Sequence, residues 1–274
     1  MNKEKKFFGV NETNWGHKWG FSDSGFIIHK DKSVSFTGNR YPICGKKLPN
    51  FIPFIEEVLG IDFRSKPKIK EISKKHVTPH NTNKNFVKEL KLTFDSDRYT
   101  FESNERILHS HGQHSTDEVY KVLYNKLEKF VDTVFYIETK KEAEQLVNLA
   151  KKHNVCLIPY GGGTNVTNAL RPPAKENRMI VSVDTRRMNS IENIDKENLM
   201  ATVQAGITGK DLESALNKEG YTTGHEPDSY EFSTIGGWIS TNAAGMKKHR
   251  YGNIEDIVQN ITMVTPVGTI NQKK

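Results

Sequence analysis

Apolar residues in the second half of the chain follow the two periods of regular secondary structure. Short runs of β-branched and apolar residues, bounded by turn residues, predict strands. These predicted strands cover residues 133–137, 155–158, 179–183, 199–205, 258–264 and 267–270. Because strands and helices alternate without a regular βαβ count, the sequence predicts an α+β fold.

Two helices are predicted between these strands. The sequence Thr139-Lys-Lys-Glu142 is a capping box, and it predicts a helix that runs to Lys152 and packs against a sheet. Thr208 begins the second predicted helix, and Gly220 ends it. The inward positions are Ala143, Leu146, Val147 and Ala150 in the first helix and Leu212, Ala215 and Leu216 in the second.

The first half of the chain has a different character. Residues 64–100 carry Lys, Ser, Asn, Thr and Pro with little periodicity, which predicts an extended linker or a segment wrapped over the surface. The composition changes near residue 130. We therefore predict an irregular, partly helical N-terminal region with a linker at residues 1–126, followed by a second domain at residues 127–274.

A glycine-rich run at residues 158–166 points to an anion. The apolar residues 155–158 supply a strand, Pro159 ends it, and the glycines at 161–163 can adopt positive φ and leave no side chain between backbone and ligand. The run lacks the Lys-Ser/Thr of a P-loop and the G-x-G-x-x-G spacing of a dinucleotide-binding βαβ unit. It therefore predicts either a third kind of nucleotide site or a plain flexible turn.

A second segment, residues 224–253, is dense in glycine and small hydroxyl residues and poor in large aliphatic ones. Small residues let a backbone approach a ligand closely, and hydroxyl groups can donate to phosphate oxygens or ring carbonyls. The composition is suited to a long, flat ligand. The hydroxyl residues concerned are Ser229, Ser233, Thr234, Ser240 and Thr241.

Together the two segments resemble the flavin-binding domain of the vanillyl-alcohol-oxidase group. Within that group the chain is most similar to the alkyldihydroxyacetone-phosphate synthase family, the flavoenzymes of ether-lipid synthesis. The resemblance also includes the N-terminal third, so it covers nearly the whole chain. The matching phrases are Gly-His-Glu-Pro-Asp-Ser at 224–229, Glu-Phe-Ser-Thr at 231–234, Gly-Gly-Trp at 236–238, Gly-Met-Lys-Lys at 245–248 and Tyr-Gly-Asn-Ile-Glu-Asp at 251–256, with residues 19–24, 37–42 and 109–113 in the N-terminal third.

The resemblance implies a PCMH-type fold at residues 127–274 that binds FAD non-covalently. Gly236 and Gly237 would let the backbone pass over the flavin ring, and His225 raises the alternative of a covalent link, which this family does not use. The cofactor-binding residues implied by the family's motifs are Pro159, Tyr160, Gly161, Gly162, Gly163, Thr164, Asn165, Asp228, Ser229, Tyr230, Glu231, Phe232, Ser233, Thr234, Ser240, Thr241, Asn242 and Ala243.

The resemblance also implies a reaction. The family exchanges the acyl group of acyl-dihydroxyacetone phosphate for a long-chain fatty alcohol, without net redox change. This sequence stops at Lys274, where the family continues into a cap domain, so we expect a truncated flavin domain and assign no catalytic side chain. Two alternatives stay open: an FAD-dependent hydroxy-acid or alcohol oxidase, and an inactive truncated homologue that acts by association.

Charge and composition narrow the choice of partners. The net charge of +7 is spread over lysines mixed with acids, without the aromatic interleaving of a nucleic-acid groove. We therefore expect no nucleic-acid partner, whereas contact with an anionic bilayer fits the charge. The family further implies a homodimer in the peroxisome that touches the peroxisomal membrane peripherally. No apolar run reaches the 18 to 20 or so residues of a membrane span, and the start of the chain does not resemble a secretory signal.

Metal binding is not expected. Cys44 and Cys156 match no metal-binding spacing and are predicted to be free thiols. His109, His111 and His114 form a cluster, but alternation along a strand would place His114 on the opposite face from the other two. Since no cysteine or paired carboxylate completes the set, the sequence does not favour a metal site there.

Overall fold

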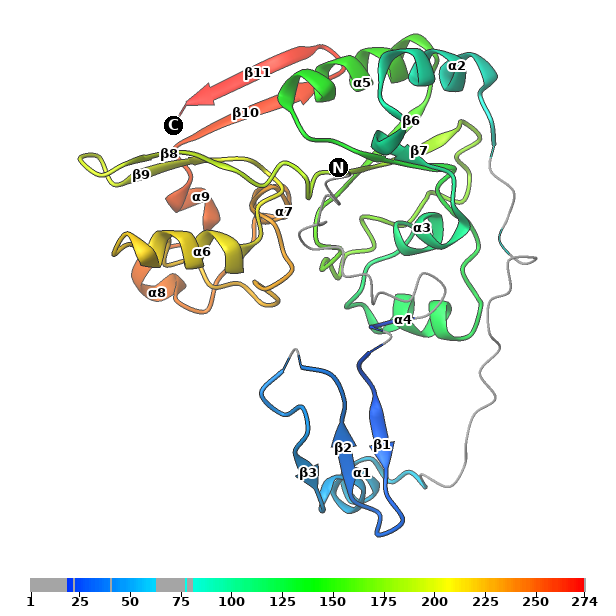
Figure 1. Ribbon diagram of the computed structural model, residues 1–274, viewed down its shortest axis with the longest axis vertical. Helices are drawn as coiled ribbons and strands as arrows, with labels where there is room; N and C mark the ends of the chain where they lie inside the picture. Colours follow the sequence, from blue (N-terminus) through cyan, green and yellow to red (C-terminus); the bar gives the residue numbers. More distant parts are fainter. Residues whose placement is uncertain (1–18, 22, 40, 63–76, 78–80, 274) are drawn as a thin grey trace, which may run out of the picture.

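The structure is a computed structural model that describes residues 19–21, 23–39, 41–62, 77 and 81–273 (Figure 1). The expectations for the start of the chain and for the lysine-rich residues 66–75, as well as Ser22 and Arg40 of the matching phrases, lie outside these residues. The strands are β1 (Phe26–Ile28), β2 (Val34–Phe36), β3 (Lys47–Leu48), β4 (Tyr99–Thr100), β5 (Thr133–Tyr136), β6 (Cys156–Tyr160), β7 (Ile180–Asp184), β8 (Ile191–Asp195), β9 (Met200–Val203), β10 (Asn260–Thr265) and β11 (Gly268–Lys273).

Helices connect and cover these strands, which confirms a mixed arrangement of helix and sheet. They are α1 (Phe51–Leu59), α2 (Lys84–Thr93), α3 (Ser103–Leu108), α4 (Thr116–Leu123), α5 (Lys140–Lys152), α6 (Gly209–Lys218), α7 (Ile235–Ser240), α8 (Lys248–Tyr251) and α9 (Ile254–Ile257), with a short 3-10 helix η2 (Ser96–Arg98). Within the described residues, none combines the length and apolar character needed to cross a membrane.

A small module at the N-terminal end consists of β1, β2, β3 and α1, drawn in blue at the bottom of Figure 1. Its three strands pair antiparallel in sequence order. Phe26 of β1 stacks on Phe51 of α1 with ring centroids 5.6 Å apart, which joins the sheet to the helix. The module is too thin to bury its larger side chains, so Phe26 remains 58% exposed and Phe54 remains 61% exposed.

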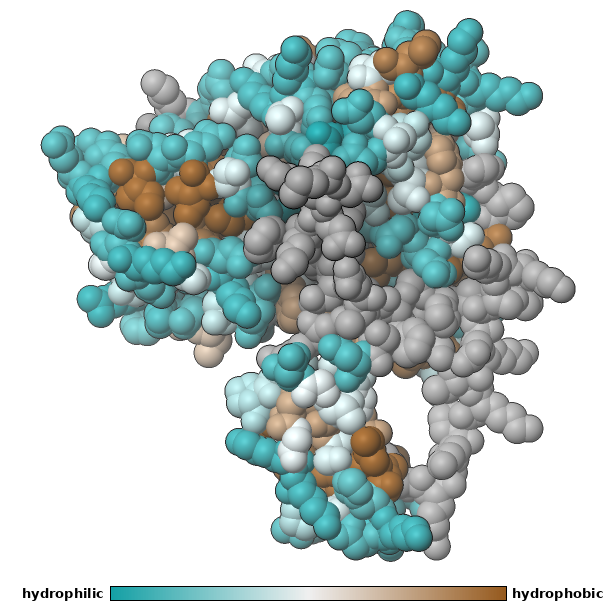
Figure 2. All heavy atoms as spheres, in the orientation of Figure 1, coloured by the Kyte–Doolittle hydropathy of each residue, from teal (hydrophilic) through white to brown (hydrophobic). Residues whose placement is uncertain are grey.

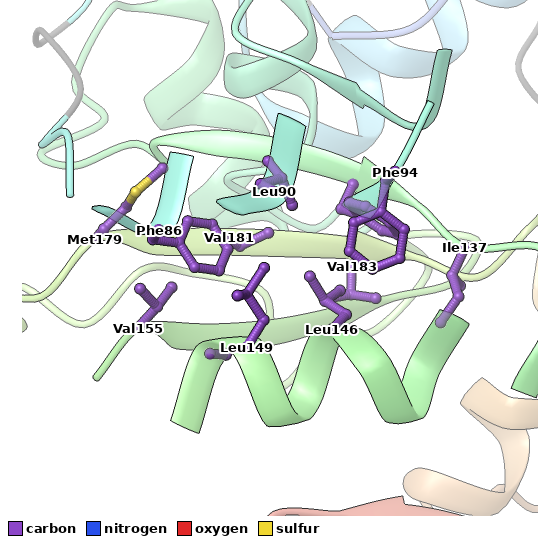
Figure 3. Packing of buried hydrophobic residues seen from close by; sticks show 12 residues of the cluster. Phe86, Leu90, Phe94, Ile137, Leu146, Leu149, Val155, Met179, Val181 and Val183 are labelled. Carbon is purple, nitrogen blue, oxygen red and sulfur yellow. The ribbon is translucent and has the colours of Figure 1, made fainter. Parts of the chain in front are cut away.

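The central sheet has the strand order β4-β5-β7-β6. Strands β5, β7 and β6 run parallel, and the short β4 pairs antiparallel with β5 at one edge. Every residue of β5 and β7 is buried, as expected for inner parallel strands covered by helices. Figure 3 shows one covered face, where Phe86, Leu90 and Phe94 meet Leu146 and Leu149 across Val181 and Val183.

Helix α2 corrects the prediction of a linker over residues 64–100. The side chain of Asn83 accepts a hydrogen bond from the Phe86 N–H and caps the helix, and Phe86 and Leu90 are fully buried. The segment looked irregular because only one narrow stripe of this lysine-rich helix is apolar. Core packing thus extends upstream of residue 126, while the boundary between residues 1–126 and 127–274 remains a prediction.

Helix α5 confirms its sequence signal. Thr139 accepts a hydrogen bond from the Glu142 N–H, and the Glu142 carboxylate accepts one from the Thr139 N–H, forming the predicted capping box. The following strand is longer than predicted, because Pro159 lies inside β6 instead of ending it. Proline is tolerated there because β6 is an edge strand with a single neighbour, β7.

A second unit contains the β8–β9 hairpin with α6, α7 and α9. Its core packs Leu212 and Leu216 of α6 with Trp238 of α7. Figure 2 shows apolar side chains gathered between the hairpin and α6, where Ile194 and Val203 pack partly buried against that core. The sequence predicted β9 and α6 but missed β8.

The predicted pair of terminal strands is confirmed as the antiparallel hairpin β10–β11. It lies beside α5 in Figure 1. The Thr269 hydroxyl donates to the Glu144 carboxylate at 2.6 Å, and the Lys151 ammonium donates to the Pro266 carbonyl at 3.0 Å. These contacts tie the end of the described chain to the central sheet.

Candidate cofactor-binding site

The glycine turn at residues 161–163 follows the carboxyl end of β6. Gly163 has φ +71°, a left-handed value that favours glycine. Gly161 and Gly162 do not have positive φ, so of the three glycines only Gly163 uses this conformational freedom. A Cβ atom on Gly162 would overlap the Phe232 carbonyl, and one on Gly161 would overlap the Thr234 hydroxyl. These glycines let the turn lie directly against the second predicted loop.

The backbone of the glycine turn carries free hydrogen-bond donors. Within the described part of the chain, the N–H groups of residues 161–165 donate to no other residue. Four of the five residues are partly accessible, and Gly163 is buried. A row of unpaired N–H groups at the end of a strand binds an anion well, because each donor is already oriented. The turn therefore fits a diphosphate.

Many polar groups of the second loop, residues 228–234, form hydrogen bonds within the loop or with the following helix α7. Ser229 has φ +59°, and its carbonyl accepts from the N–H groups of Phe232 and Ser233 at 2.9 and 2.8 Å. The Ser233 hydroxyl accepts from the Trp238 indole at 2.7 Å. Thr234 caps α7 by accepting from the Gly237 N–H at 3.3 Å. Ser233 and Thr234 thus form hydrogen bonds within the protein, and they are also candidate contacts of the cofactor.

The third predicted contact, residues 240–243, lies at the C-terminal end of α7. Ser240 and Thr241 donate back to the carbonyls of Gly236 and Gly237 at 2.7 and 2.8 Å. The described contacts do not join this segment to the glycine turn. Gly236 packs on protein, since a Cβ atom there would lie 2.9 Å from the Cβ atom of Ala205, and its role over the flavin ring stays a prediction.

The segment at residues 109–114 was missed as part of this site. The Gln113 N–H donates to the Gly163 carbonyl at 2.7 Å, and His114 Nδ1 lies 2.9 Å from the Ser229 hydroxyl. One segment therefore touches both predicted cofactor loops. The alternation of a strand does not apply to these histidines, since His109 directly follows α3. No group of three or more His, Cys, Asp or Glu side chains suited to a metal ion occurs among the residues that the structure describes.

Behind the glycine turn lies a buried charge cluster. His109 Nε2 lies 2.9 Å from Asp184 Oδ2, and Arg186 Nε donates to Asp184 Oδ1 at 3.0 Å. Burial alone would raise the pKa of the Asp184 carboxyl, but the Arg186 guanidinium and His109 hold it well below its usual range. The ring of Tyr160 packs on both His109, at 4.4 Å between centroids, and the Arg186 guanidinium, at 5.2 Å.

Two buried side chains near the loops have polar atoms without partners in the described structure. Glu118 is fully buried beside Gly112 and Asn165, and neither of its carboxyl oxygens has a hydrogen-bond partner. His225 is 2% exposed, packs edge-on against Trp238 at 4.9 Å, and has no partner for either ring nitrogen. The sequence drew attention to His225 but not to Glu118.

Comparison with known proteins agrees with this geometry. A family model described as FAD binding domain matches residues 131–272. The alkyldihydroxyacetonephosphate synthase of Caenorhabditis elegans is 42% identical over 258 residues, which are 93% of this chain and 42% of that protein. The synthase of Dictyostelium discoideum is 36% identical over 92% of this chain and 43% of its own length. The chain thus spans less than half the length of these relatives.

Solved structures show the same relationship. A structure of an alkyldihydroxyacetonephosphate synthase has a TM-score of 0.88 at 32% identity and covers 99% of this chain and 49% of that chain. A Physcomitrella patens BBE-like 1 variant, 18% identical with a TM-score of 0.52, shares the fold alone. The predicted flavin-binding fold and the resemblance to the synthases are therefore confirmed. Because the family model matches residues 131–272, we conclude that this chain belongs to the FAD binding domain family. The same match and the free N–H groups of the glycine turn identify FAD as its cofactor.

Proposed function

We propose that this chain is the FAD-binding portion of an alkyldihydroxyacetonephosphate synthase. Such an enzyme exchanges the acyl group of acyl-dihydroxyacetone phosphate for a long-chain fatty alcohol and releases a fatty acid. Similarity to the synthases over 92–93% of the chain supports this proposal, because it extends through the N-terminal region as well as the flavin fold. The proposal includes the two substrates, acyl-dihydroxyacetone phosphate and a long-chain fatty alcohol.

The observation that carries the proposal is the row of free N–H groups at residues 161–165, held against residues 232–234. In this proposal the turn binds the diphosphate of FAD non-covalently. The residues proposed to surround the cofactor are those at 159–165, 228–234 and 240–243. When bound, the flavin supplies the covalent chemistry of the exchange. The chain supplies binding and orientation, and we assign it no catalytic side chain.

The first experiment is a titration of the purified chain with FAD, followed by fluorescence and by retention of the flavin on a desalting column. We expect one FAD to remain bound and to be released by denaturation, as a non-covalent cofactor would be. Failure of the chain to retain FAD would contradict the proposal. A flavin that stays attached after denaturation would instead support a covalent link at a residue such as His225.

A second experiment tests the reaction. The loaded chain is incubated with acyl-dihydroxyacetone phosphate and a labelled fatty alcohol, and transfer of label into alkyl-dihydroxyacetone phosphate is measured. Transfer would support synthase activity in this chain. FAD binding without transfer would support a binding portion without full activity.

The rival function is an FAD-dependent oxidase. The glycolate oxidase subunit GlcD of Bacillus subtilis is 32% identical, but over only 51% of this chain. The synthases match the N-terminal region too, so the similarity favours the synthase. Oxygen consumption with a 2-hydroxy acid, in the absence of alkyl transfer, would reverse this choice.

Location and assembly are proposed on the same basis. We propose a peroxisomal protein that forms a homodimer and touches the membrane peripherally. Its net charge of +7 supports contact with an anionic bilayer. Flotation with anionic and neutral vesicles tests the contact, and light scattering tests the dimer.

A further inference from the structure

The buried charge cluster behind the glycine turn joins the N-terminal region to the sheet. Asp184 ends β7 exactly where Tyr160 ends β6, and the two residues are paired in the strand register. His109 reaches Asp184 from a position 75 residues upstream. The cluster therefore lies next to Tyr160, the residue that directly precedes the glycine turn.

The histidine bridges two acceptors. His109 Nδ1 lies 2.8 Å from the Glu105 carbonyl, and Nε2 lies 2.9 Å from the Asp184 carboxylate. A carbonyl and a carboxylate can only accept hydrogen bonds, so a ring nitrogen that carries a hydrogen donates to the acceptor that it faces. The two ring nitrogens face acceptors on two different elements, helix α3 and the end of β7. His109 is thus held in one orientation, with its ring against Tyr160 at 4.4 Å.

The contacts continue from the cluster to the turn. Tyr160 is buried against both His109 and Arg186, and its hydroxyl lies 2.5 Å from the point that a Cβ atom on Gly163 would occupy. The backbone around Tyr160 is fixed as well, because its carbonyl accepts from the Thr185 N–H at 2.9 Å. A shift of Tyr160 would therefore move Gly163 and change the direction of the free N–H groups.

We propose that His109 is a positioning residue for the FAD site. Through Asp184 and Arg186 it holds Tyr160, and through Tyr160 it holds the glycine turn in the geometry that leaves its N–H groups free. This inference rests on the proposed binding of the FAD diphosphate at the turn. If the inference holds, the affinity for FAD depends on His109, a residue of the N-terminal region that contacts Tyr160 and not the free N–H groups themselves.

The test compares His109→Gln with His153→Gln in the full chain. His153 is a matched control, because its Nε2 lies 2.8 Å from the Glu89 carboxylate and it also joins two elements, α2 and α5. Three quantities are measured for each: the Kd for FAD, the visible circular dichroism of the bound flavin, and the Tm of the apoprotein. We expect His109→Gln to raise the Kd about tenfold or more and to change the flavin dichroism, by analogy with the loss of about 10–100-fold in affinity when the partner of a metal-binding side chain is removed.

The control separates positioning from general stability. We expect His153→Gln to lower the Tm without moving the Kd or the flavin spectrum. Arg186→Lys, which keeps the charge but loses the two-point contact with Asp184, should resemble His109→Gln and serves if the latter does not fold. An unchanged Kd and flavin spectrum in the folded cluster variant, or equal changes in the control, would overturn the inference. A wild-type chain that binds no FAD would overturn the proposed function first, and the inference with it.

Discussion

Gly162 lies so close to Phe232 that a Cβ atom on the glycine would overlap the carbonyl oxygen of the phenylalanine. The two residues are 70 positions apart, and each belongs to a different predicted cofactor loop. Their contact is between backbones, so neither side can move away as a flexible side chain could. The shape of the site therefore depends on the absence of a single methyl group.

We predict that Gly162→Ala weakens FAD binding at least tenfold and lowers stability by about 1–3 kcal/mol, the usual cost of overpacking. The methyl group must push residues 161–165 away from residue 232. A fluorescence titration with FAD and a thermal melt measure the two effects. Gly25→Ala is the control, because a Cβ atom there meets no atom within 4 Å. Normal FAD binding by Gly162→Ala would show that the two loops need not touch.

Phe86 provides a test of which residues belong to the flavin-binding core. It is fully buried against the sheet, although it lies in the segment predicted to be a linker. We predict that Phe86→Ala lowers the free energy of unfolding by about 3–5 kcal/mol. Leu92→Ala in the same helix should change little, since Leu92 is 78% exposed. Urea unfolding measures both, and equal effects would mean that α2 is not part of the core.

Glu118 is predicted to reduce stability. Its carboxyl group is fully buried and has no hydrogen-bond partner among the described residues. Since a buried polar group without a partner costs about 1–3 kcal/mol, Glu118→Met, which removes both carboxyl oxygens and keeps a similar length, should raise the Tm. Glu192→Met, at an exposed position, should leave it unchanged. A lower Tm for Glu118→Met would show that the carboxyl group has a partner in solution.

His111 should make stability depend on pH. Burial lowers the pKa of His111 from 6.5 to about 4, and its Nδ1–H donates to the Gly112 carbonyl at 2.8 Å. Between these values the unfolded chain binds a proton that the folded chain does not. The free energy of unfolding should therefore fall by roughly 3 kcal/mol from this residue as the pH is lowered from about 6.5 to 4.

The variant His111→Asn isolates this effect, because asparagine can donate to the same carbonyl but does not titrate in this range. Urea unfolding at several pH values gives the difference in slope between the two proteins. Parallel curves for wild type and variant would contradict the assigned pKa.

Local signals in the sequence predicted local structure well. The capping box at Thr139 and Glu142 fixes the start of α5 through contacts three residues apart, so the pattern is sufficient on its own. Strand β8 was missed because only Ile191 and Ile194 are apolar, and the hairpin is irregular between Ile191 and Asn193. Helix α2 was missed because its buried residues, Phe86 and Leu90, are spaced among lysines.

The site shows the same division. The glycine turn and the second loop, residues 228–234, were recognised as motifs in the sequence. The contact between them could not be derived from spacing, because it depends on where β6 and α7 lie in the fold. His109 was considered only as part of a histidine cluster, and the spacing of that cluster does not show that His109 directly follows α3. Its partner Asp184 is 75 residues away and follows an apolar run that indicates a strand and nothing more.

The strand order β4-β5-β7-β6 also determines when each strand can pair while the chain is being synthesised. Strand β6 leaves the ribosome before β7, yet β7 is its only neighbour in the sheet and separates it from β5. Strand β6 therefore stays unpaired, and β5 has only the two-residue β4 as a neighbour, until β7 has been made. Such delayed parallel pairing folds slowly and exposes the growing chain to aggregation. A nascent chain of this protein is therefore most exposed to aggregation in the interval before Asp184 emerges.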